Sequence, residues 1–587
     1  MPNSEAQEPE ILESELCPNC GAELGRIETY HTHQVCEYCG FHFSLSAWER
    51  IRQLVDTGTF RETDRSLAAD PRALREQVPY SQSLGEARAR TGLTGAVVTG
   101  QGKIGKTQVV LAVTDFGFMG GSMGSAVGEK VARAFERAIK KGLPVVTVVT
   151  SGGARMQEGV LSLMQMAKTA AVVQRLHAAG LPYISVLANP CTGSAYASFA
   201  SLADYIVAEP GALIGVAPLR AVQEAAEGPL PQGAHTSEAH LRHGLVDQVV
   251  ERSKLKPLLA ATLELLGRRQ RLKSKQGRGT FKKTEADTQA WHQVQLARHA
   301  RRPSATDYIA RLTPSFIELH GDRLYGDDPA IICGLGALDG RPVMFIGQER
   351  HRGGGGQQGR AYPEGFRKAQ RAMRLAAKLH LPLVTLIDTP GAFAGVEAEE
   401  RGLGNAIAES LALMSDLQTP IVSCVTGEGG SEAALALSVA DRLLMLEHAI
   451  YEVISPEAAA NLIYGDPERA EEIASALRLT AYDCKDLGVI DAVVPEPAEG
   501  AHNDHDEAAR LLKRALLEEL RQLQGIRLGS LLRQRHERYR KMGENSHQFR
   551  EALRERVRRL RRRLRRGRGT KGGAPEEAGE EGPPPIP

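Results

Sequence analysis

Two stretches of the sequence, 238 residues apart, carry the same strand and turn, and they constrain the fold more than any other feature. They are Leu143–Gly159 (LPVVTVVTSGGARMQEG) and Leu381–Gly395 (LPLVTLIDTPGAFAG). Each begins with Leu-Pro, continues as a β-branched apolar run and ends at a glycine turn, which is the pattern of a buried strand. Glycine after a strand lets backbone N–H groups approach a ligand closely.

Further segments repeat in the same order along the chain. Leu202–Val216 is similar to Val439–Val453, and Leu245–Val250 (LVDQVV) is similar to Val489–Val494 (VIDAVV). A period this long indicates two copies of a whole domain rather than a solenoid. With 587 residues, the chain is long enough for two such halves and a smaller unit.

Composition and charge exclude several classes of protein. The formal net charge of +2 argues against a general polyanion binder. The acidic first residues contain no apolar segment, so we expect no secretory signal, and no apolar run approaches the roughly 20 residues needed to span a bilayer. We therefore expect a cytoplasmic protein without a membrane partner. Four scattered cysteines fit that reducing compartment: Cys191, Cys333, Cys424 and Cys484.

Near the N-terminus, CPNC (Cys17, Cys20) and CEYC (Cys36, Cys39) have the spacing of a zinc site. Four thiolates close a tetrahedral shell, so the ion would be structural. We expect His31 and His33, in the intervening hairpin, to be surface residues rather than ligands. Two redox-active Cys pairs are the alternative interpretation, and a zinc ribbon can also contact nucleic acid.

The first half contains several further elements. Asp70–Arg90 is charged and predicted to be a surface connection, and Asp115–Lys130 is a glycine-rich loop that either makes a tight crossover or holds a ligand. Gln157–Ala179 is predicted to be a long helix whose apolar residues, its methionines included, face the core. Gly193–Ser194 is predicted to open a small-residue helix, and free N–H groups there could hold an oxyanion.

These motifs, together with those of the second half, identify a family resemblance. SMGSAVGEK, SGGARMQEG, ALIGV and the cysteine cluster resemble the beta subunit of the bacterial acetyl-CoA carboxylase carboxyltransferase. ELHGDRLYGDDPAI, PEGFRKAQRAMRLA, IDTPGAFAGVEAEERG, VISPEAAA and PEPAEGAH resemble its alpha subunit. The resemblance runs from about Cys17 to about Leu523, as in a beta–alpha fusion.

The resemblance implies an α/β fold with two homologous crotonase-like domains, each a β-β-α superhelix, preceded by a zinc ribbon. It implies transfer of CO2 from carboxybiotin on a carrier protein to acetyl-CoA, which gives malonyl-CoA. Two oxyanions develop, on the thioester and on the ureido group of biotin, so two donor pockets are needed. Family placement puts their backbone donors at Gly193–Ser194 and Glu432–Ala433, with Gly152, Gly153, Gly391 and Gly430 forming the substrate-binding walls. Biotin's own nitrogen can accept the proton.

The sequence departs from the family pattern at three places. Gly193-Ser194 stands where the beta motif usually has Gly-Gly, and Ser431-Glu432-Ala433 stands where the alpha motif usually has Ser-Gly-Gly. A backbone N–H survives both changes, and we expect the Glu432 carboxylate to point away from the enolate. At the third place, Gly347–Arg352 (GQERHR) stands where the alpha subunit usually has the basic stretch Gly-His-Gln-Lys-Gly-Arg. Its arginines and one that follows are either ligands of the coenzyme A phosphates or solvated charges: Arg350, Arg352 and Arg360.

The domain bounds and partners follow from these assignments. We expect a zinc ribbon at 13–45, a beta-type domain at 46–267, a basic linker at 268–290, an alpha-type domain at 291–525, and a basic helical extension with a disordered tail at 526–587. The sequence has neither the Met-Lys-Met carrier motif nor a P-loop. The implied partners are therefore a biotin carboxyl carrier protein, a biotin carboxylase and a second copy of the chain, which would complete a beta2-alpha2 core.

Two alternative functions remain. One is a carboxyltransferase for another acyl-CoA, such as propionyl-CoA, whose pocket would need room for an extra methyl group. The other is a non-catalytic, nucleic-acid-binding regulator that uses the ribbon and the basic run Arg556–Arg568; this alternative is not favoured.

Overall fold

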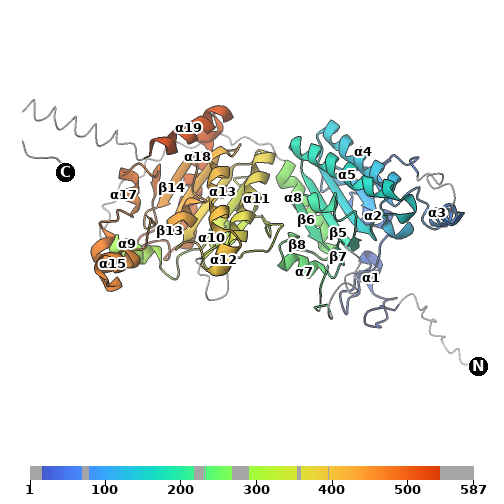
Figure 1. The fold of residues 1–587 in the computed structure, drawn as a ribbon, viewed down its shortest axis with the longest axis horizontal. Helices are drawn as coiled ribbons and strands as arrows, with labels where there is room; N and C mark the ends of the chain where they lie inside the picture. Colours follow the sequence, from blue (N-terminus) through green and yellow to red (C-terminus); the bar gives the residue numbers. More distant parts are fainter. Residues whose placement is uncertain are drawn as a thin grey trace, which may run out of the picture. The chain divides into compact units, whose positions relative to one another are not determined.

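The duplicated sequence forms two α/β halves, seen here in a computed structural model (Figure 1). The structure describes residues 16–68, 78–216, 230–231, 233–267, 290–352, 359–393 and 395–542. The basic run Arg556–Arg568, the acidic tail and nearly all of the predicted linker lie outside these residues.

The first half is built around an eight-stranded sheet in which β1 to β3 are antiparallel and the later strands run parallel. Its spatial order is β1-β2-β3-β4-β5-β6-β8, with β7 paired to β5. The strands are β1 (Arg61–Thr63), β2 (Val97–Ile104), β3 (Thr107–Thr114), β4 (Val145–Ser151), β5 (Tyr183–Thr192), β6 (Tyr205–Ala208), β7 (Ile214–Gly215) and β8 (Gln248–Val249). The helices are α1 (Glu28–His33), α2 (Ala47–Leu54), α3 (Val78–Thr91), α4 (Ser125–Lys141), α5 (Val160–Ala178), α7 (Ser237–Arg242) and α8 (Arg252–Gly267).

The second half repeats this topology strand for strand, in the order β9-β10-β11-β12-β13-β14-β16 with β15 paired to β13. The strands are β9 (Phe316–Glu318), β10 (Ile331–Leu338), β11 (Arg341–Gln348), β12 (Leu383–Thr389), β13 (Ile421–Gly430), β14 (Arg442–Leu446), β15 (Ile450–Glu452) and β16 (Ala492–Val494). The helices are α9 (Ala290–Ala297), α10 (Ala305–Leu312), α11 (Pro363–Leu379), α12 (Val396–Glu400), α13 (Leu403–Asp416), α14 (Ser431–Leu435), α15 (Pro456–Tyr464), α16 (Ala470–Ala474), α17 (Ala481–Asp486), α18 (His505–Gln524) and α19 (Leu528–Lys541). The predicted duplication is therefore present in the fold.

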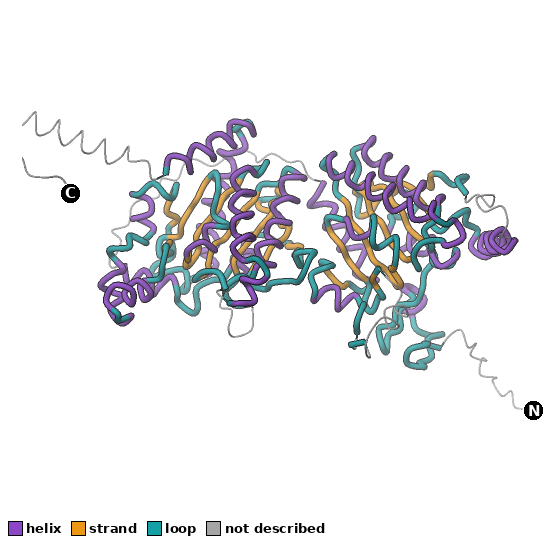
Figure 2. Tube along the Cα trace, in the orientation of Figure 1, coloured by secondary structure: helices purple, strands orange, loops and turns teal. Residues whose placement is uncertain are grey.

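Helices cover the sheets in the same way in both halves (Figure 2). In the first half α4 packs beside α5, and in the second half α11 packs beside α13. Helix α4 buries Val127, Val131, Phe135 and Ala138, the i, i+4 and i, i+3 spacing of an amphipathic helix. The central strands β4 and β12 are buried along their whole length, as their continuous apolar runs predict.

Three predictions about the segments that precede β5 are wrong. His31 and His33 lie in α1 rather than in a hairpin, and part of the predicted surface connection forms α3, which buries Tyr80, Leu84 and Ala87. The third error concerns α5. It buries Ser162, Gln165 and Thr169 near its start, whereas nearby apolar side chains are exposed: Met156, Val160, Leu161, Leu163 and Met164.

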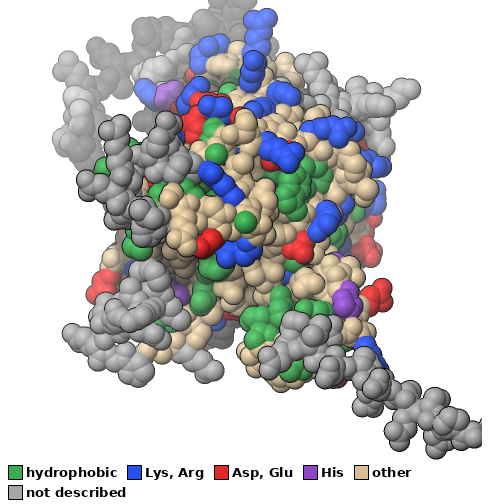
Figure 3. All heavy atoms as spheres, turned by 90° about the vertical axis from the view of Figure 1, so that its right-hand side faces the viewer, with side chains coloured by type: hydrophobic (Ala, Val, Ile, Leu, Met, Phe, Trp, Pro, Cys, Tyr) green, Lys and Arg blue, Asp and Glu red, His purple; other side chains and the backbone are tan. Residues whose placement is uncertain are grey.

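Lys and Arg side chains do not gather into one patch on the face of the first half that Figure 3 shows. They lie separately, with acidic and hydrophobic side chains between them. Within the described residues, no helix is both long enough and apolar enough to cross a membrane.

Candidate functional site

The predicted walls of the first site lie where β4 ends. Gly153 has a φ of +114°, a conformation that favours glycine, and its N–H donates to Ser151 Oγ at 3.1 Å. The glycine-rich loop packs directly against this turn. Gly152 N–H donates to Gly120 O at 2.8 Å, and a Cβ on Gly121 would lie 2.4 Å from Thr150 O. Glycines of the loop thus allow its backbone to pack closely against the backbone at the end of β4.

A second network fixes the same loop, and sequence reasoning missed it. The carboxylate of Glu158 accepts hydrogen bonds from Tyr80 Oη at 2.9 Å and Ser125 N at 2.6 Å. Arg155, also buried, donates to Glu158 and to Ser122 O. Burial alone would raise the pKa of Glu158, but these donors hold it below its usual value. The network locks the SGGARMQEG turn onto the start of α4.

The predicted oxyanion donors Gly193 and Ser194 lie at the end of β5, against the β4 turn. A Cβ on Gly193 would lie 2.6 Å from Gly153 Cα, so the two turns touch. Gly193 N–H donates to Gly215 O at 2.9 Å, which leaves Ser194 as the available donor of this pair. No acceptor for Ser194 N–H occurs among the described residues.

The small-residue helix predicted at Gly193–Ser194 does not form. Ala197 N–H donates to Gly193 O and Ala200 N–H to Ala195 O, so i→i+4 and i→i+5 turns replace a regular helix. A 3₁₀ turn at Ala200–Leu202 follows. The donors are therefore positioned by β5 and these turns rather than by a helix.

Strand register identifies the equivalent turn in the second half. Thr192 pairs with Gly215 in the first sheet, and Gly430 pairs with Glu452 in the second. The counterparts of Gly193–Ser194 are thus Ser431–Glu432, one residue before the predicted pair Glu432–Ala433. In agreement, Gly193 and Ser431 both have a positive φ, of +67° and +45°.

The walls of the second site match those of the first. Gly391 N–H donates to Thr389 Oγ1 at 3.1 Å, as Gly153 does to Ser151. A Cβ on Gly430 would lie 2.4 Å from the Pro390 carbonyl carbon, so this position requires glycine. Ser194, Glu432 and Ala433 are not among the positive-φ residues, and their departure from glycine therefore carries no backbone strain.

The side chain of Glu432 is exposed and accepts a hydrogen bond from the Ser431 hydroxyl. That hydrogen bond lowers the pKa of Glu432, so the carboxylate is charged at neutral pH. No backbone carbonyl accepts from the Glu432 N–H within the part of the chain that is described, but the carboxylate of the same residue does. The second turn therefore presents a backbone donor beside a charged but locally bonded side chain.

The three predicted arginines differ in their surroundings. Arg350 Nη2 lies 3.0 Å from Asp388 Oδ1 and 2.9 Å from Glu428 Oε2, so its charge is already matched inside the protein. Arg352 is exposed and pairs with Glu318 at 2.7 Å. Arg360 is partly buried beside the start of α11. Arg350 is thus held between two carboxylates, whereas Arg352 pairs with one carboxylate at the surface.

A cluster of charges at the carboxyl ends of β11, β12, β13 and β15 was not predicted. Arg298 bonds Glu428 at 2.7 Å and Glu457 at 2.6 Å, and lies 3.9 Å from Glu452. Burial and the neighbouring Glu428 carboxylate raise the pKa of Glu452 to about 8. Since Glu452 pairs with Gly430, this neutral carboxyl adjoins the second turn.

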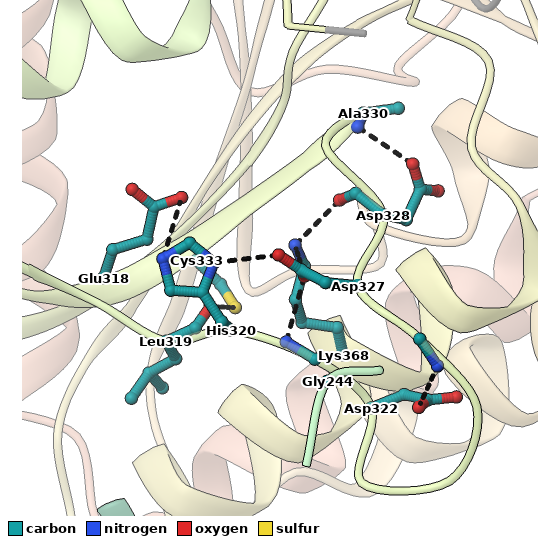
Figure 4. Close-up of polar contacts among 12 residues, drawn as sticks. Gly244, Glu318, Leu319, His320, Asp322, Asp327, Asp328, Ala330, Cys333 and Lys368 are labelled. Carbon is teal, nitrogen blue, oxygen red and sulfur yellow. Dashed lines mark hydrogen bonds and ion pairs between the residues drawn. The ribbon is translucent and has the colours of Figure 1, made fainter. Parts of the chain in front are cut away.

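The motif ELHGDRLYGDDPAI of the second half forms another polar cluster (Figure 4). His320 Nδ1 lies 2.8 Å from Asp327, and Nε2 lies 3.9 Å from Glu318. Lys368 Nζ contacts Asp327 at 2.5 Å. A Cβ on Gly321 would lie 2.0 Å from Gly244 Cα. The cluster thus orders this motif, and the close approach of Gly321 to Gly244 brings it against the first half.

The four predicted zinc ligands converge in space. Their sulfur atoms all lie within 4.8 Å of one another, at 3.6 Å for Cys17–Cys39 and 3.7 Å for Cys20–Cys36. Tetrahedral Zn–S bonds of about 2.3 Å require sulfur separations of about 3.8 Å. Gly21 and Gly40 have φ values of +72° and +70° and make two matching knuckles. The donor set therefore fits a structural zinc ion.

Both halves of the chain match known protein families. Residues 240–543 match the family described as acetyl co-enzyme A carboxylase carboxyltransferase-like, and residues 44–232 match the carboxyl transferase domain. A relative from Salinispora tropica, named acetyl-coenzyme A carboxylase carboxyl transferase subunits beta/alpha, is 45% identical over 90% of this chain and 96% of its own. A relative of the same name from Clostridium tetani is 41% identical over 90% and 92%.

Among solved structures, the transcarboxylase 12S hexamer core is similar in fold. It superposes with a TM-score of 0.68 at 21% identity, covering 86% of this chain and 92% of the other. This likeness confirms the predicted fold class of two crotonase-like α/β domains.

Proposed function

The chain belongs to the family of acetyl-CoA carboxylase carboxyltransferases, as a fusion of the beta and alpha subunits, and from this membership we propose how its halves share the reaction. The enzyme transfers a carboxyl group to acetyl-CoA and forms malonyl-CoA for fatty acid synthesis. When bound, carboxybiotin on its carrier protein supplies that carboxyl group. Residues of each half stabilise one of the two oxygens that become negatively charged.

In the first half, the N–H of Ser194 faces one oxyanion, and Gly193 fixes the turn through its bond to Gly215. In the second half, the N–H of Glu432, the register counterpart of Ser194, faces the other, and we keep the N–H of Ala433, the next residue along the chain, as a second donor. Fixed backbone dipoles stabilise developing charge without reorganising during the reaction. The observation that carries this assignment is the register match between the two turns, which follow equivalent central strands.

The substrate-binding walls are the glycine turns at Gly152–Gly153 and Gly391, together with Gly430. We assign the coenzyme A phosphates to Arg352 and Arg360, which can exchange a surface contact for a phosphate. Arg350 has a different role, because it is held by Asp388 and Glu428. It neutralises the carboxylates beneath the second turn.

Cys17, Cys20, Cys36 and Cys39 hold one zinc ion, which has no open coordination position and no part in the chemistry. Reduced thiolates and a coenzyme A substrate fit a cytoplasmic location. The domain bounds proposed from the sequence remain our assignment, with the change between halves in the segment after α8.

Partners follow from the same reaction. A biotin carboxyl carrier protein must bring the carboxyl group, and a separate biotin carboxylase must load it. A second copy of this chain would cover the apolar side chains exposed around the start of α5, such as Met156 and Val160, which adjoin the Gly152–Gly153 turn. Light scattering should give about twice the 63.5 kDa chain mass; a mass near one chain contradicts the dimer.

The reverse reaction tests the proposed function. Purified protein receives malonyl-CoA with biocytin, and acetyl-CoA formation is followed, with methylmalonyl-CoA in a parallel reaction. We expect malonyl-CoA to be turned over in preference. Preference for methylmalonyl-CoA would support the propionyl-type alternative, and no turnover of either by a folded, zinc-loaded chain would overturn the catalytic assignment.

A further inference from the structure

The first half's turn is short of backbone donors. Gly152 N–H is bonded to Gly120 O at 2.8 Å, Gly153 N–H to Ser151 Oγ at 3.1 Å, and Gly193 N–H to Gly215 O at 2.9 Å. An oxyanion in water-excluded surroundings needs preorganised donors. Three of the backbone N–H groups where the two turns meet are therefore already used inside the protein.

Ser194 has the opposite character. The residue is only 6% exposed, and its Oγ is buried with no hydrogen-bond partner among the described residues. Its own carbonyl is occupied by Ser198 Oγ at 2.6 Å. A buried hydroxyl without a partner is destabilising and calls for an explanation in a native site. An acceptor that arrives with the substrate supplies one.

We propose that the Ser194 hydroxyl is a catalytic donor: it hydrogen-bonds the carbonyl oxygen that becomes negatively charged in the first half, beside the N–H of the same residue. This inference rests on the proposed function. The hydroxyl keeps its proton throughout, and no bond to Ser194 forms or breaks. The contribution is a hydrogen bond that strengthens as negative charge develops.

The second half shows why this hydroxyl matters at position 194 and not at its counterpart. There the equivalent residue is Glu432, and the hydroxyl of Ser431 is already donated to the Glu432 carboxylate. The second turn thus offers backbone donors alone, whereas the first offers one backbone donor and one side-chain donor. The two oxyanion sites are chemically different despite their matching register.

The test compares Ser194→Ala, which removes only Oγ, with Ser194→Gly, which also removes Cβ and keeps the N–H. In the malonyl-CoA plus biocytin reaction, we expect both variants to lose kcat by roughly 10- to 100-fold with KM for malonyl-CoA changed less than about threefold. Ser185→Ala is the matched control. It removes another buried serine hydroxyl of the same segment, which accepts from Thr147 at 3.1 Å, and should keep wild-type kcat.

A spectroscopic measurement identifies which oxygen is held. Infrared difference spectra are taken with acetyl-CoA labelled with carbon-13 at the thioester carbonyl, and with biocytin labelled at the ureido carbon. A hydrogen bond from Ser194 lowers the carbonyl stretching frequency. We expect the stretching band of one of the two labelled carbonyls to return to higher frequency in Ser194→Ala. The carbonyl whose band shifts is the one that Ser194 hydrogen-bonds.

Three outcomes would overturn the inference: wild-type kcat in both variants, loss of kcat in Ser194→Ala but not in Ser194→Gly, or no shift of either label. Failure of the proposed function shows separately, as absence of turnover in the wild-type chain. In that case a label shift lost in Ser194→Ala would still support the contact between this hydroxyl and the carbonyl.

Discussion

Ionisation of the Glu452 carboxyl should destabilise the folded chain, and a single substitution at this position should remove that effect. In the unfolded chain its carboxyl ionises near the ordinary pKa of 4.5, whereas in the folded chain burial and Glu428 raise the pKa to about 8. The unfolded state therefore loses its proton first, and stability falls as pH rises from about 4.5 to about 8. Glu452→Gln should melt at a higher temperature than wild type at pH 9 and at nearly the same temperature at pH 5.

Thermal unfolding followed by circular dichroism across this pH range checks the expectation. Glu472→Gln is the control, because Glu472 pairs with Arg469 on the exposed surface, where such pairs contribute about 0–1 kcal/mol. A Glu452→Gln chain no more stable than wild type at pH 9 would show that Glu452 is ionised in the fold without penalty.

Glu432 tests whether a carboxylate at the second turn is harmful. Its side chain is exposed and bonded to Ser431, so it should not face the developing oxyanion. Glu432→Gln, which keeps the size and the backbone N–H, should change kcat of the malonyl-CoA reaction less than about threefold. An increase in kcat of more than tenfold in Glu432→Gln would mean that the wild-type carboxylate faces the oxyanion and opposes its charge.

The sequence predicts the glycine turns of the site but not which donors are free. The walls at Gly153 and Gly391 follow from strand and turn patterns that are local in the chain. Gly193 N–H is not free because it donates to Gly215 O, in a strand 22 residues later along the chain. The pairing of Glu452 with Gly430 depends on the register of β13 and β15. Neither leaves a periodic signal in the sequence.

At the scale of elements, α5 shows what hydrophobic periodicity can and cannot predict. Its apolar residues have helical spacing, and the helix forms, but the spacing does not reveal what covers the apolar face. Ser162, Gln165 and Thr169 are buried instead because their side chains find acceptors within the helix: Gly159 O, Leu161 O and Gln165 O. An apolar face toward solvent is the pattern of an interface rather than a core.

Removal of zinc should unfold the ribbon while the rest of the chain stays folded. Arg252, at the start of α8, donates to the carbonyls of His33, Gln34 and Phe43, and this anchor does not replace the metal. Zinc removal by a chelator should expose the amides of residues 16–43 to hydrogen exchange, because binding energy at a structural zinc site is folding energy. The amides of β4 and β5 should remain protected.

Metal analysis supplies the matched comparison. Cys20→Ser should lower bound zinc from about one ion per chain to near zero, whereas Cys484→Ala, a buried cysteine outside the cluster, should leave it unchanged. Zinc retained in Cys20→Ser, or exchange that spreads into β4 and β5 on chelation, would contradict an independent structural ribbon.

Across the whole molecule, the duplication extends to a pair of aspartates that the two copies use in the same way. Asp204 and Asp441 accept from the N–H groups of Tyr183 and Ile421, both at 2.8 Å. In the first copy, the remaining charge is met by Lys378 of the second half, at 2.6 Å. The sequence predicts the paired aspartates through the repeat. It does not predict that Lys378 of α11 contacts Asp204, because no sequence pattern links these two residues.

Asp247 makes a second connection between the halves. It is fully buried, accepts from Ile206 N–H, and contacts Arg323 and Arg371 of the second half. Burial alone would raise the pKa of Asp247, but the two guanidiniums hold it below its usual value. Removing the carboxylate leaves two half-buried guanidiniums facing each other without this counter-charge, which costs at most about 3–5 kcal/mol, the range for a fully buried pair.

Asp247→Asn should therefore lower the melting temperature and split unfolding into two calorimetric transitions, since the halves lose the charge that couples them. The control Glu129→Gln removes the exposed partner of Lys168 within one half and should shift melting little. If Asp247→Asn unfolds in one transition at an unchanged temperature, its ion pairs do not join the halves. In that case apolar packing or the contact of Gly244 with Gly321 must carry the coupling.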